Sequence, residues 1–174
     1  SPLQRHFIMS SACGVCGKAS IESLKSRISI HPPLGGAISA DTIKELPNRL
    51  ESAQAIFQQT GGLHAAALFD KDGNLLELRE DVGRHNALDK LMGWAFMSGK
   101  MPLENTTLLV SGRASFELVQ KCVAGGIPIF CAVSAPSSLA VELAKSFGLT
   151  LVGFLRRDRF NIYTGSERII CPKS

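Results

Sequence analysis

Long apolar runs are missing from this sequence. No apolar stretch approaches the roughly 20 residues that a helix needs to cross a bilayer, so we expect no membrane span. The first ten residues also lack the basic and apolar regions of a signal peptide. Because the chain begins at Ser1 rather than Met, this second absence says little about export.

A strong excess of positive charge is missing as well. Lys and Arg number 19 against 15 Asp and Glu, which gives a net charge of +4 at pH 7. Binding to nucleic acid by charge alone needs a larger and more clustered excess, so we expect no nucleic-acid partner. The arginines that do cluster, Arg156, Arg157 and Arg159, favour a small anionic ligand instead.

The five cysteines do not form a disulfide framework. An odd count without a regular spacing indicates a reducing compartment, and we expect a cytoplasmic protein. Cys122 lies in an apolar helical stretch and Cys131 in an apolar strand. Both are therefore predicted to be small buried hydrophobic residues.

The remaining composition is that of a globular chain. Hydrophobic residues make up 45% and charged residues 20% of the 174 positions, enough to bury a sizeable core. Residues 1–40 are rich in Gly, Pro and Ser and show little periodicity, which predicts an irregular N-terminal arm. Residues 41–174 are predicted to form a single α/β domain.

Apolar spacing predicts the first elements of that domain. A short helical turn is expected from Asp41, and Pro47 suits the first position of a helix, where no N–H is needed. The apolar face of this helix is predicted to consist of Leu50, Ala53, Ile56 and Phe57. Gly61 and Gly62 are predicted to end it. A hairpin follows, with strands over 64–70 and 75–80. Asn86 is predicted to cap the next helix, which Gly99 closes.

Strands and helices then alternate. Strands are predicted over 106–110, 127–133 and 150–154, helices over 115–123 and 137–147, and a last short strand over 161–164. Such alternation is typical of right-handed βαβ units with a parallel sheet. The earlier hairpin makes the predicted sheet mixed.

The first chemical motif is the pair Cys13 and Cys16 in a glycine-rich stretch. Two cysteines at this spacing can bind metal, form a redox disulfide or carry a persulfide. A structural zinc site needs two further ligands, and no second cysteine pair exists. Lys18 favours a reactive thiolate, so the motif favours nucleophilic sulfur chemistry, with a redox or metal role and inert surface thiols as the alternatives.

A second group of candidate residues lies where three predicted strands end. These residues are Ser111, Gly112 and Arg113, then Ser134, Pro136 and Ser137, then Arg156 and Arg157. Ligands bind beyond the carboxyl ends of parallel strands, and helix N-termini attract phosphate. Together the three segments predict a site for a nucleotide-like ligand. The alternative is ordinary helix capping by Ser115 and Ser137 beside a solvated basic loop.

The junction from Glu80 to Asn86 is dense in charge. Its Arg84 and His85 are candidates for contact with a ligand or a partner, and a surface turn with an Asp–Arg pair is the alternative. His64 is isolated at the start of a predicted strand. We interpret it as a satisfied core residue rather than a catalytic one.

Six segments, in order, carry a family resemblance: FIMSSACGVCG from Phe7, TGGLHAAALFD from Thr60, EDVGRHNALDK from Glu80, SGRASFELVQK from Ser111, SAPSSLAVELA from Ser134 and GFLRRDRFNIYTG from Gly153. They resemble the signature blocks of the FdhD-type formate dehydrogenase accessory proteins, which usually carry an additional N-terminal segment. The resemblance implies a cytidine-deaminase-like fold, with a mixed sheet between helices in three layers. The deaminase zinc residues are missing, because Ala65 and Ala66 follow His64 and serines follow Pro136.

The resemblance also implies a function. The family takes persulfide sulfur from a cysteine desulfurase and passes it to the molybdenum (or tungsten) bis-pyranopterin guanine dinucleotide cofactor of formate dehydrogenase. Its CxxC motif maps onto Cys13, the expected carrier, and Cys16. Its cofactor-binding block maps onto Gly153, Phe154, Leu155, Arg156 and Arg157. The family suggests a homodimer. A non-catalytic chaperone that binds the cofactor and delivers it to the dehydrogenase is the alternative.

Overall fold

A computed structural model of the chain describes Ile21, residues 35–54 and residues 61–171. Cys13 and Cys16 lie outside the described residues, as does most of the predicted arm. Within the described part, no helix is both long and apolar enough to cross a membrane.

The centre of the fold is a six-stranded mixed sheet with the order β3-β2-β4-β5-β6-β7. The strands are β2 (His64–Phe69), β3 (Leu75–Asp81), β4 (Thr107–Val110), β5 (Ile129–Ala132), β6 (Thr150–Gly153) and β7 (Asn161–Thr164). β4, β5 and β6 are parallel, whereas the β2–β3 hairpin and β7 are antiparallel to their neighbours. The predicted mixed sheet is therefore confirmed.

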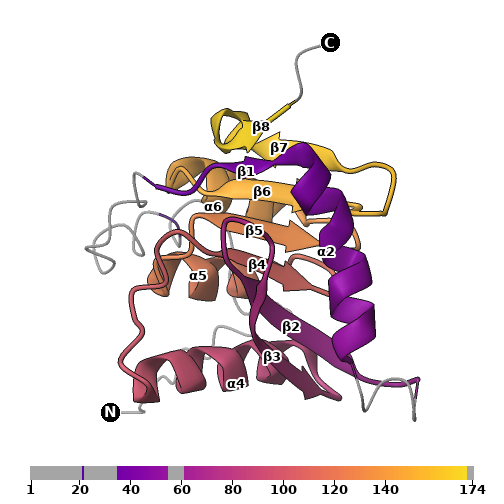
Figure 1. The fold of residues 1–174 in the computed structure, drawn as a ribbon. Helices are drawn as coiled ribbons and strands as arrows, with labels where there is room; N and C mark the ends of the chain where they lie inside the picture. The colour runs from indigo at the N-terminus through magenta and orange to yellow at the C-terminus, as the bar shows by residue number, and fades with distance from the viewer. Residues whose placement is uncertain (1–20, 22–34, 55–60, 172–174) are drawn as a thin grey trace, which may run out of the picture.

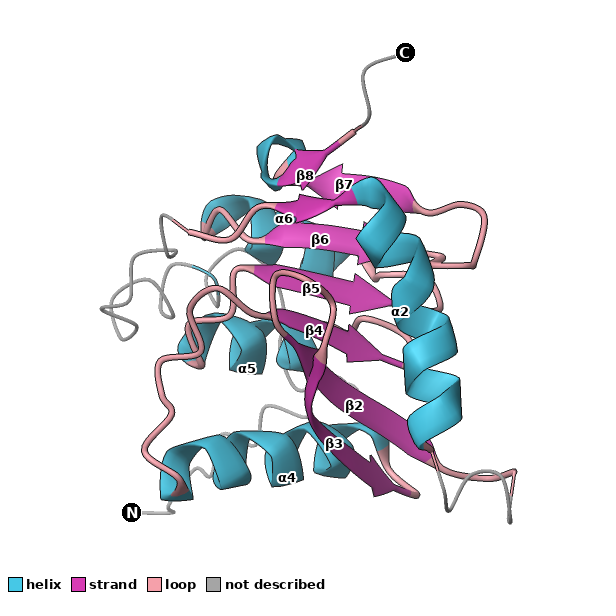
Figure 2. Ribbon diagram, viewed as in Figure 1, coloured by secondary structure: helices cyan, strands magenta, loops and turns pink. Residues whose placement is uncertain are grey.

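Helices cover both faces of this sheet, giving three layers (Figures 1 and 2). α2 (Ala40–Ala53) lies on one face, against Leu109, Cys131 and Val152. α4 (Arg84–Met97), α5 (Phe116–Ala124) and α6 (Ser138–Ser146) lie on the other, against Leu108, Phe130 and Leu151. Adjacent residues of each strand thus enter opposite cores, as the two-residue period of a strand requires.

A second, two-stranded sheet ties the start of the described chain to its end. β1 (Ile38–Ser39) pairs in parallel with β8 (Ile169–Ile170), just after the short 3₁₀ helix η1 (Ser166–Arg168). Ile38 is fully buried in the core beneath α2. Because α2 begins directly after β1, this pairing fixes the start of α2, and its first turn packs in the core on one face of the six-stranded sheet.

The prediction that a helix starts at Pro47 is wrong. α2 begins at Ala40, after an N-cap at Ser39 whose Oγ accepts a hydrogen bond from Thr42 N at 2.9 Å, and Pro47 lies inside it. Pro47 removes one backbone hydrogen bond from the helix. The helix nevertheless continues because Ile43, Leu46 and Leu50 are buried on one face across that position. Among the described residues it ends at Ala53; Ile56 and Phe57 lie outside them.

The predicted cap at Asn86 is also wrong. α4 has Gly83 as its N-cap and begins at Arg84, so Asn86 lies within the first turn. Its side-chain amide instead donates to Asp81 Oδ1 at 3.1 Å, and Gly83 N donates to the same oxygen at 2.9 Å. The Asp81 carboxylate therefore organises this turn from outside the helix.

Candidate functional site

The predicted ligand segments meet at one edge of the sheet. β4, β5 and β6 all end there, and antiparallel pairing brings the first residues of β2 and β7 to the same edge. Backbone hydrogen bonds join the loops in sequence: Ser111 N to Ala65 O at 3.0 Å, Ser134 N to Gly112 O at 3.4 Å, and Phe154 N to Ser134 O at 3.2 Å. The result is a continuous row of strand ends from His64 to Asn161.

One end of this row contains a pocket of about 310 Å³, lined by Phe154, Arg156, Arg159 and Asn161. We call it the edge pocket. Phe154 has a left-handed backbone conformation (φ 52°), and its side chain is held 41% exposed rather than in the core. A large apolar residue in that conformation is unusual and often marks a functional position. The pocket thus combines an aromatic ring, two guanidinium groups and an amide.

Gly153 supports this pocket through its missing side chain. A Cβ at this position would lie 2.8 Å from Pro136 Cδ and 2.9 Å from Tyr163 Cε2. Leu155, which was predicted to bind the cofactor, instead has its side chain buried beneath α2. Its neighbours on either side face the pocket because the chain turns sharply after β6.

Several predicted ligand residues have structural contacts of their own. Ser111 Oγ accepts a hydrogen bond from Ala65 N at 2.9 Å, and Ser137 Oγ caps α6 by accepting from Ala140 N at 3.2 Å. Arg156 Nη1 donates to the carbonyls of Val133 and Leu155. Ser134 joins the loops through its backbone, and Arg113 is exposed beside them.

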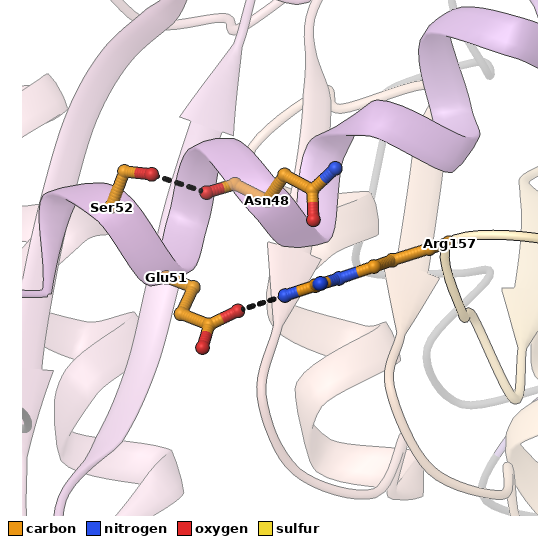
Figure 3. A pocket seen from close by; sticks show the side chains of 4 residues that line it. All are labelled: Asn48, Glu51, Ser52 and Arg157. Carbon is orange, nitrogen blue, oxygen red and sulfur yellow. Dashed lines mark hydrogen bonds and ion pairs between the residues drawn. The ribbon is translucent and has the colours of Figure 1, made fainter.

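Arg157 lies apart from the edge pocket. Its guanidinium forms an ion pair with Glu51 of α2, at 2.6 Å between Nη2 and Oε2 (Figure 3). These two residues, with Asn48 and Ser52, line a separate hollow of about 370 Å³. Both side chains of the pair are about two-thirds exposed (66% and 63%), so the pair contributes little to stability. The side chains of Arg156 and Arg157 therefore line different pockets, although the two residues are adjacent in the chain.

At the other end of the row, Gly112 lies beside His64 and Arg84, and Ser115 follows three residues later at the start of α5; we call these four residues the polar corner. A Cβ on Gly112 would lie 3.4 Å from His64 Nδ1 and 3.7 Å from Arg84 Cδ. His64 is half-buried at the sheet edge rather than in the core. His85 is half-buried beside this corner, and its pKa is lowered first by desolvation and then by the Arg84 charge.

Two polar atoms of this corner are buried without a hydrogen-bond partner among the described residues. They are Arg84 Nε and Ser115 Oγ. Ser115 is the N-cap residue of α5, yet its hydroxyl makes no capping bond. The capping role that the sequence offered for Ser115 is therefore wrong, while the same role for Ser137 is correct.

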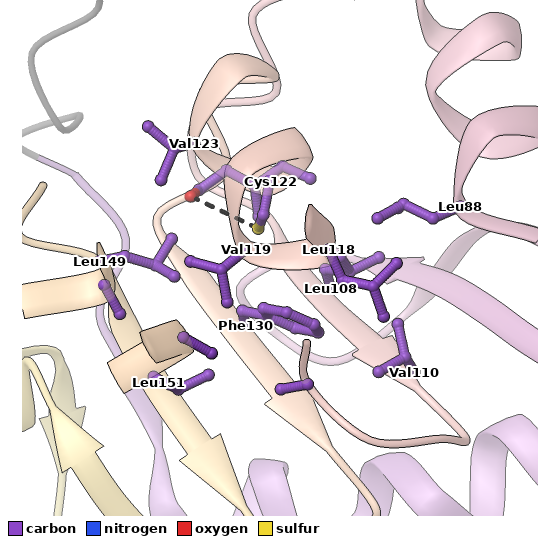
Figure 4. Close-up of a cluster of buried hydrophobic side chains, with 14 of the residues drawn as sticks. Leu88, Leu108, Val110, Leu118, Val119, Cys122, Val123, Phe130, Leu149 and Leu151 are labelled. Atoms are coloured by element: carbon purple, nitrogen blue, oxygen red, sulfur yellow. Dashed lines mark hydrogen bonds between the residues drawn. The ribbon is translucent and has the colours of Figure 1, made fainter. Parts of the chain in front are cut away.

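The core cysteines are buried as predicted. Cys122 and Cys131 are fully buried free thiols, and burial raises both pKa values, that of Cys131 to about 12. Cys122 Sγ donates to Ile127 O at 3.9 Å within the cluster around Phe130 (Figure 4). Neither thiol can act as a nucleophile in the folded chain, because the thiolate is the reactive form. Cys171, by contrast, is exposed.

Fold and site define a three-layer α/β protein with polar and aromatic residues along the carboxyl edge of its sheet. Comparison with known families makes this specific. The FdhD/NarQ family model matches residues 2–170, and the chain belongs to that family. The resemblance seen in the six sequence segments is confirmed.

The similar proteins agree. The chain is 58% identical over 166 residues to the sulfur carrier protein FdhD of Mycolicibacterium paratuberculosis, covering 95% of this chain and 61% of that protein. It is 50% identical over 165 residues to the protein of the same name from Thermoplasma acidophilum, covering 94% and 57%. The chain thus spans about three-fifths of these relatives.

A solved structure has the same fold. It is a putative formate dehydrogenase accessory protein from Desulfotalea psychrophila, with 33% sequence identity and a TM-score of 0.75. The match covers 84% of this chain and 62% of that one. The predicted fold class is confirmed.

Proposed function

We propose that this protein is a sulfur carrier that matures formate dehydrogenase. The observation that carries the proposal is its 58% identity, over 95% of the chain, with a protein named sulfur carrier protein FdhD. The solved relative, a putative formate dehydrogenase accessory protein, supports the same process. The donor is a cysteine desulfurase and the acceptor is the bis-pyranopterin guanine dinucleotide cofactor, carrying molybdenum or tungsten.

Thiolate chemistry at Cys13 and Cys16 performs the first transfer. The Cys13 thiolate attacks the outer sulfur of the desulfurase persulfide, a new S–S bond forms on Cys13, and the desulfurase cysteine leaves as a thiolate. Cys16 assists. In the second transfer the S–S bond on Cys13 breaks, Cys13 leaves as a thiolate, and the outer sulfur becomes a terminal sulfido ligand of the cofactor metal, which supplies the two electrons for this reduction by rising from the +4 to the +6 state. We place this enzymatic sulfur transfer in the reducing cytoplasm, where such thiols stay free.

The edge pocket is our candidate for the guanine nucleotide part of the cofactor. The exposed Phe154 ring offers a stacking surface for the base, and Asn161 offers amide donors and acceptors for its edge. Arg156 and Arg159 offer positive charge for the phosphates. The helix N-termini after β4 and β5 add donors along the same edge. The resemblance further supports a homodimer.

Intact mass spectrometry tests the carrier. After incubation with a cysteine desulfurase and cysteine, we expect one added sulfur on wild type and on Cys171→Ala. Cys171 is a matched control because it is exposed but lies outside the motif. Cys13→Ala is expected to lose the added sulfur. A normal persulfide on the Cys13→Ala/Cys16→Ala double variant would refute the assignment.

The edge pocket would also suit the alternative, a chaperone that only delivers the cofactor. The two functions differ in whether the cysteines are needed. Complementation of a strain lacking the protein decides between them: the double cysteine variant should fail to yield active formate dehydrogenase. Full maturation by that variant would instead establish the chaperone.

Calorimetric titration tests the pocket. Guanosine diphosphate should bind more tightly than guanosine monophosphate, and binding should weaken with salt because exposed charges are screened within about 10 Å at 0.1 M. Phe154→Ala and Arg159→Gln should each weaken binding about tenfold. Lys44→Gln, on α2, is the control and should bind normally. Equal affinity in all variants would place the nucleotide elsewhere.

A further inference from the structure

We propose that the polar corner of His64, Arg84, Gly112 and Ser115 is a second subsite, which binds an anionic sulfur atom. The proposal rests on the sulfur-carrier function and names the part of the reaction that this end of the sheet edge serves. It adds His64 and Ser115, which sequence reasoning had assigned to the core and to a helix cap.

The unpartnered polar atoms are the first observation. Buried polar groups in folded proteins are almost always hydrogen-bonded, since an orphaned buried donor costs about 1–3 kcal/mol and a charged one more. Arg84 Nε and Ser115 Oγ are both orphaned in the described chain. Arg84 is the first residue of α4 and lies beside Gly112, and Ser115 is the N-cap of α5, three residues after Gly112 in the chain. A ligand that accepts from both would satisfy them together.

The two helix starts form the second observation. α2 and α6 begin with serine side chains that cap them, whereas α4 and α5 begin without any side-chain cap. The first-turn N–H groups of α4 and α5 therefore remain available, and their dipoles add positive potential. Two carboxylates are near: Asp81 is engaged by Lys90, Gly83 N and Asn86, and Glu117 lies in the first turn of α5. The donors of the corner thus favour an anion.

The third observation is space. Because Gly112 has no Cβ, a ligand atom can approach its backbone closely on the side that faces the His64 ring and the Arg84 stem, which a Cβ there would touch at van der Waals distance. Neighbouring Ala114, Phe116 and Ala87 are buried and apolar. A large, weakly hydrated sulfur anion loses less on entering such surroundings than a compact oxyanion does.

The polar corner lies at a distance from the edge pocket that suits the end of the cofactor opposite its guanine, where sulfur is transferred. From β6, where the edge pocket lies, to β2 the sheet crosses three strand spacings of about 4.8 Å, or roughly 14 Å. An extended dinucleotide held by its guanine in the edge pocket can lie along the row and bring its far end to the corner. The sulfur bound there is either the persulfide of the carrier or a thiolate of the cofactor.

Thiosulfate, with sulfate as the matched anion, probes the corner in the full chain by calorimetry. We expect thiosulfate to bind more tightly, and Arg84→Gln to weaken it about tenfold or more. Gly112→Ala fills the space at ordinary contact distances, so the protein should fold and still lose binding. Lys44→Gln should bind as wild type. Unchanged thiosulfate affinity in Gly112→Ala and Arg84→Gln, or equal binding of sulfate, would overturn the proposal.

Two further measurements distinguish a failure of this subsite from a failure of persulfide loading or of nucleotide binding. Persulfide loading and guanosine diphosphate affinity should be normal in Gly112→Ala, while sulfur transfer to the cofactor is lost; normal transfer would overturn the proposal. Comparing thiosulfate binding to the thiol and persulfidated forms identifies the natural occupant. Exclusion of thiosulfate by persulfidation points to the carrier's own sulfur, and unchanged binding points to a sulfur of the cofactor.

Discussion

The serines before α5 and α6 should respond differently to alanine, although both occupy N-cap positions. Ser137 Oγ accepts from Ala140 N, so Ser137→Ala should cost about 1 kcal/mol. In a chain of 174 residues that lowers the midpoint of thermal unfolding by about 2–4 °C. Ser115 Oγ is buried and makes no such bond. Ser115→Ala should therefore leave the midpoint unchanged or raise it, because an orphaned hydroxyl is removed.

Calorimetric scans of the two variants beside wild type measure the difference, and urea unfolding checks it by a second route. A comparable loss in Ser115→Ala would show that its hydroxyl caps α5. That result would also remove one of the two orphaned atoms on which the polar corner rests. Saturating thiosulfate adds a second readout: it should stabilise wild type more than Ser115→Ala, because only wild type offers the hydroxyl.

Three further outcomes are expected. In native protein, alkylation counted by intact mass should modify Cys171 but not Cys122 or Cys131, which should react only after unfolding; modification of either in the native state would contradict their burial. Gly153→Ala should lower the unfolding midpoint and weaken guanosine diphosphate binding, because its Cβ would clash with Pro136 and Tyr163. The Asp81 pKa is lowered to about 2, first by Lys90, so its stabilising effect should be complete above pH 3.8 and be lost as pH falls towards 2. Acid titration of Asp81→Asn should lack this change, and an unaltered acid profile would refute it.

The sequence predicted most elements after residue 64 because their apolar residues repeat at strand or helix spacing and their ends carry glycine or serine. It failed where tertiary contacts outweigh local preference. Pro47 has a strong local preference for a helix start, yet packing of Ile43, Leu46 and Leu50 extends α2 through it. Asparagine is a residue type that often caps helices, but Asp81 of the preceding strand accepts hydrogen bonds from the Asn86 side chain and from the N–H of Gly83, which is the N-cap residue of α4.

The site was predicted as a set of segments but not as individual contacts. Strand order brings those segments together, and strand order follows from the βαβ pattern. The direction of each side chain depends on single backbone angles that the pattern does not encode. The left-handed turn at Phe154 exposes its ring and is followed by Leu155 in the core and Arg157 at α2. His64 was misassigned because its neighbours Gly112 and Arg84 are 48 and 20 residues away in sequence.

The mixed sheet lengthens the edge along which we propose that an extended substrate binds. A purely parallel sheet would offer strand ends only from β4, β5 and β6. The antiparallel hairpin and β7 add the beginnings of β2 and β7 to the same edge, which lengthens the row in both directions. The edge pocket lies between the end of β6 and the start of β7, and the polar corner lies at the start of β2. The nucleotide site and the sulfur site that we propose are thereby separated by roughly 14 Å, so we expect a substitution at one of them to leave affinity at the other unchanged.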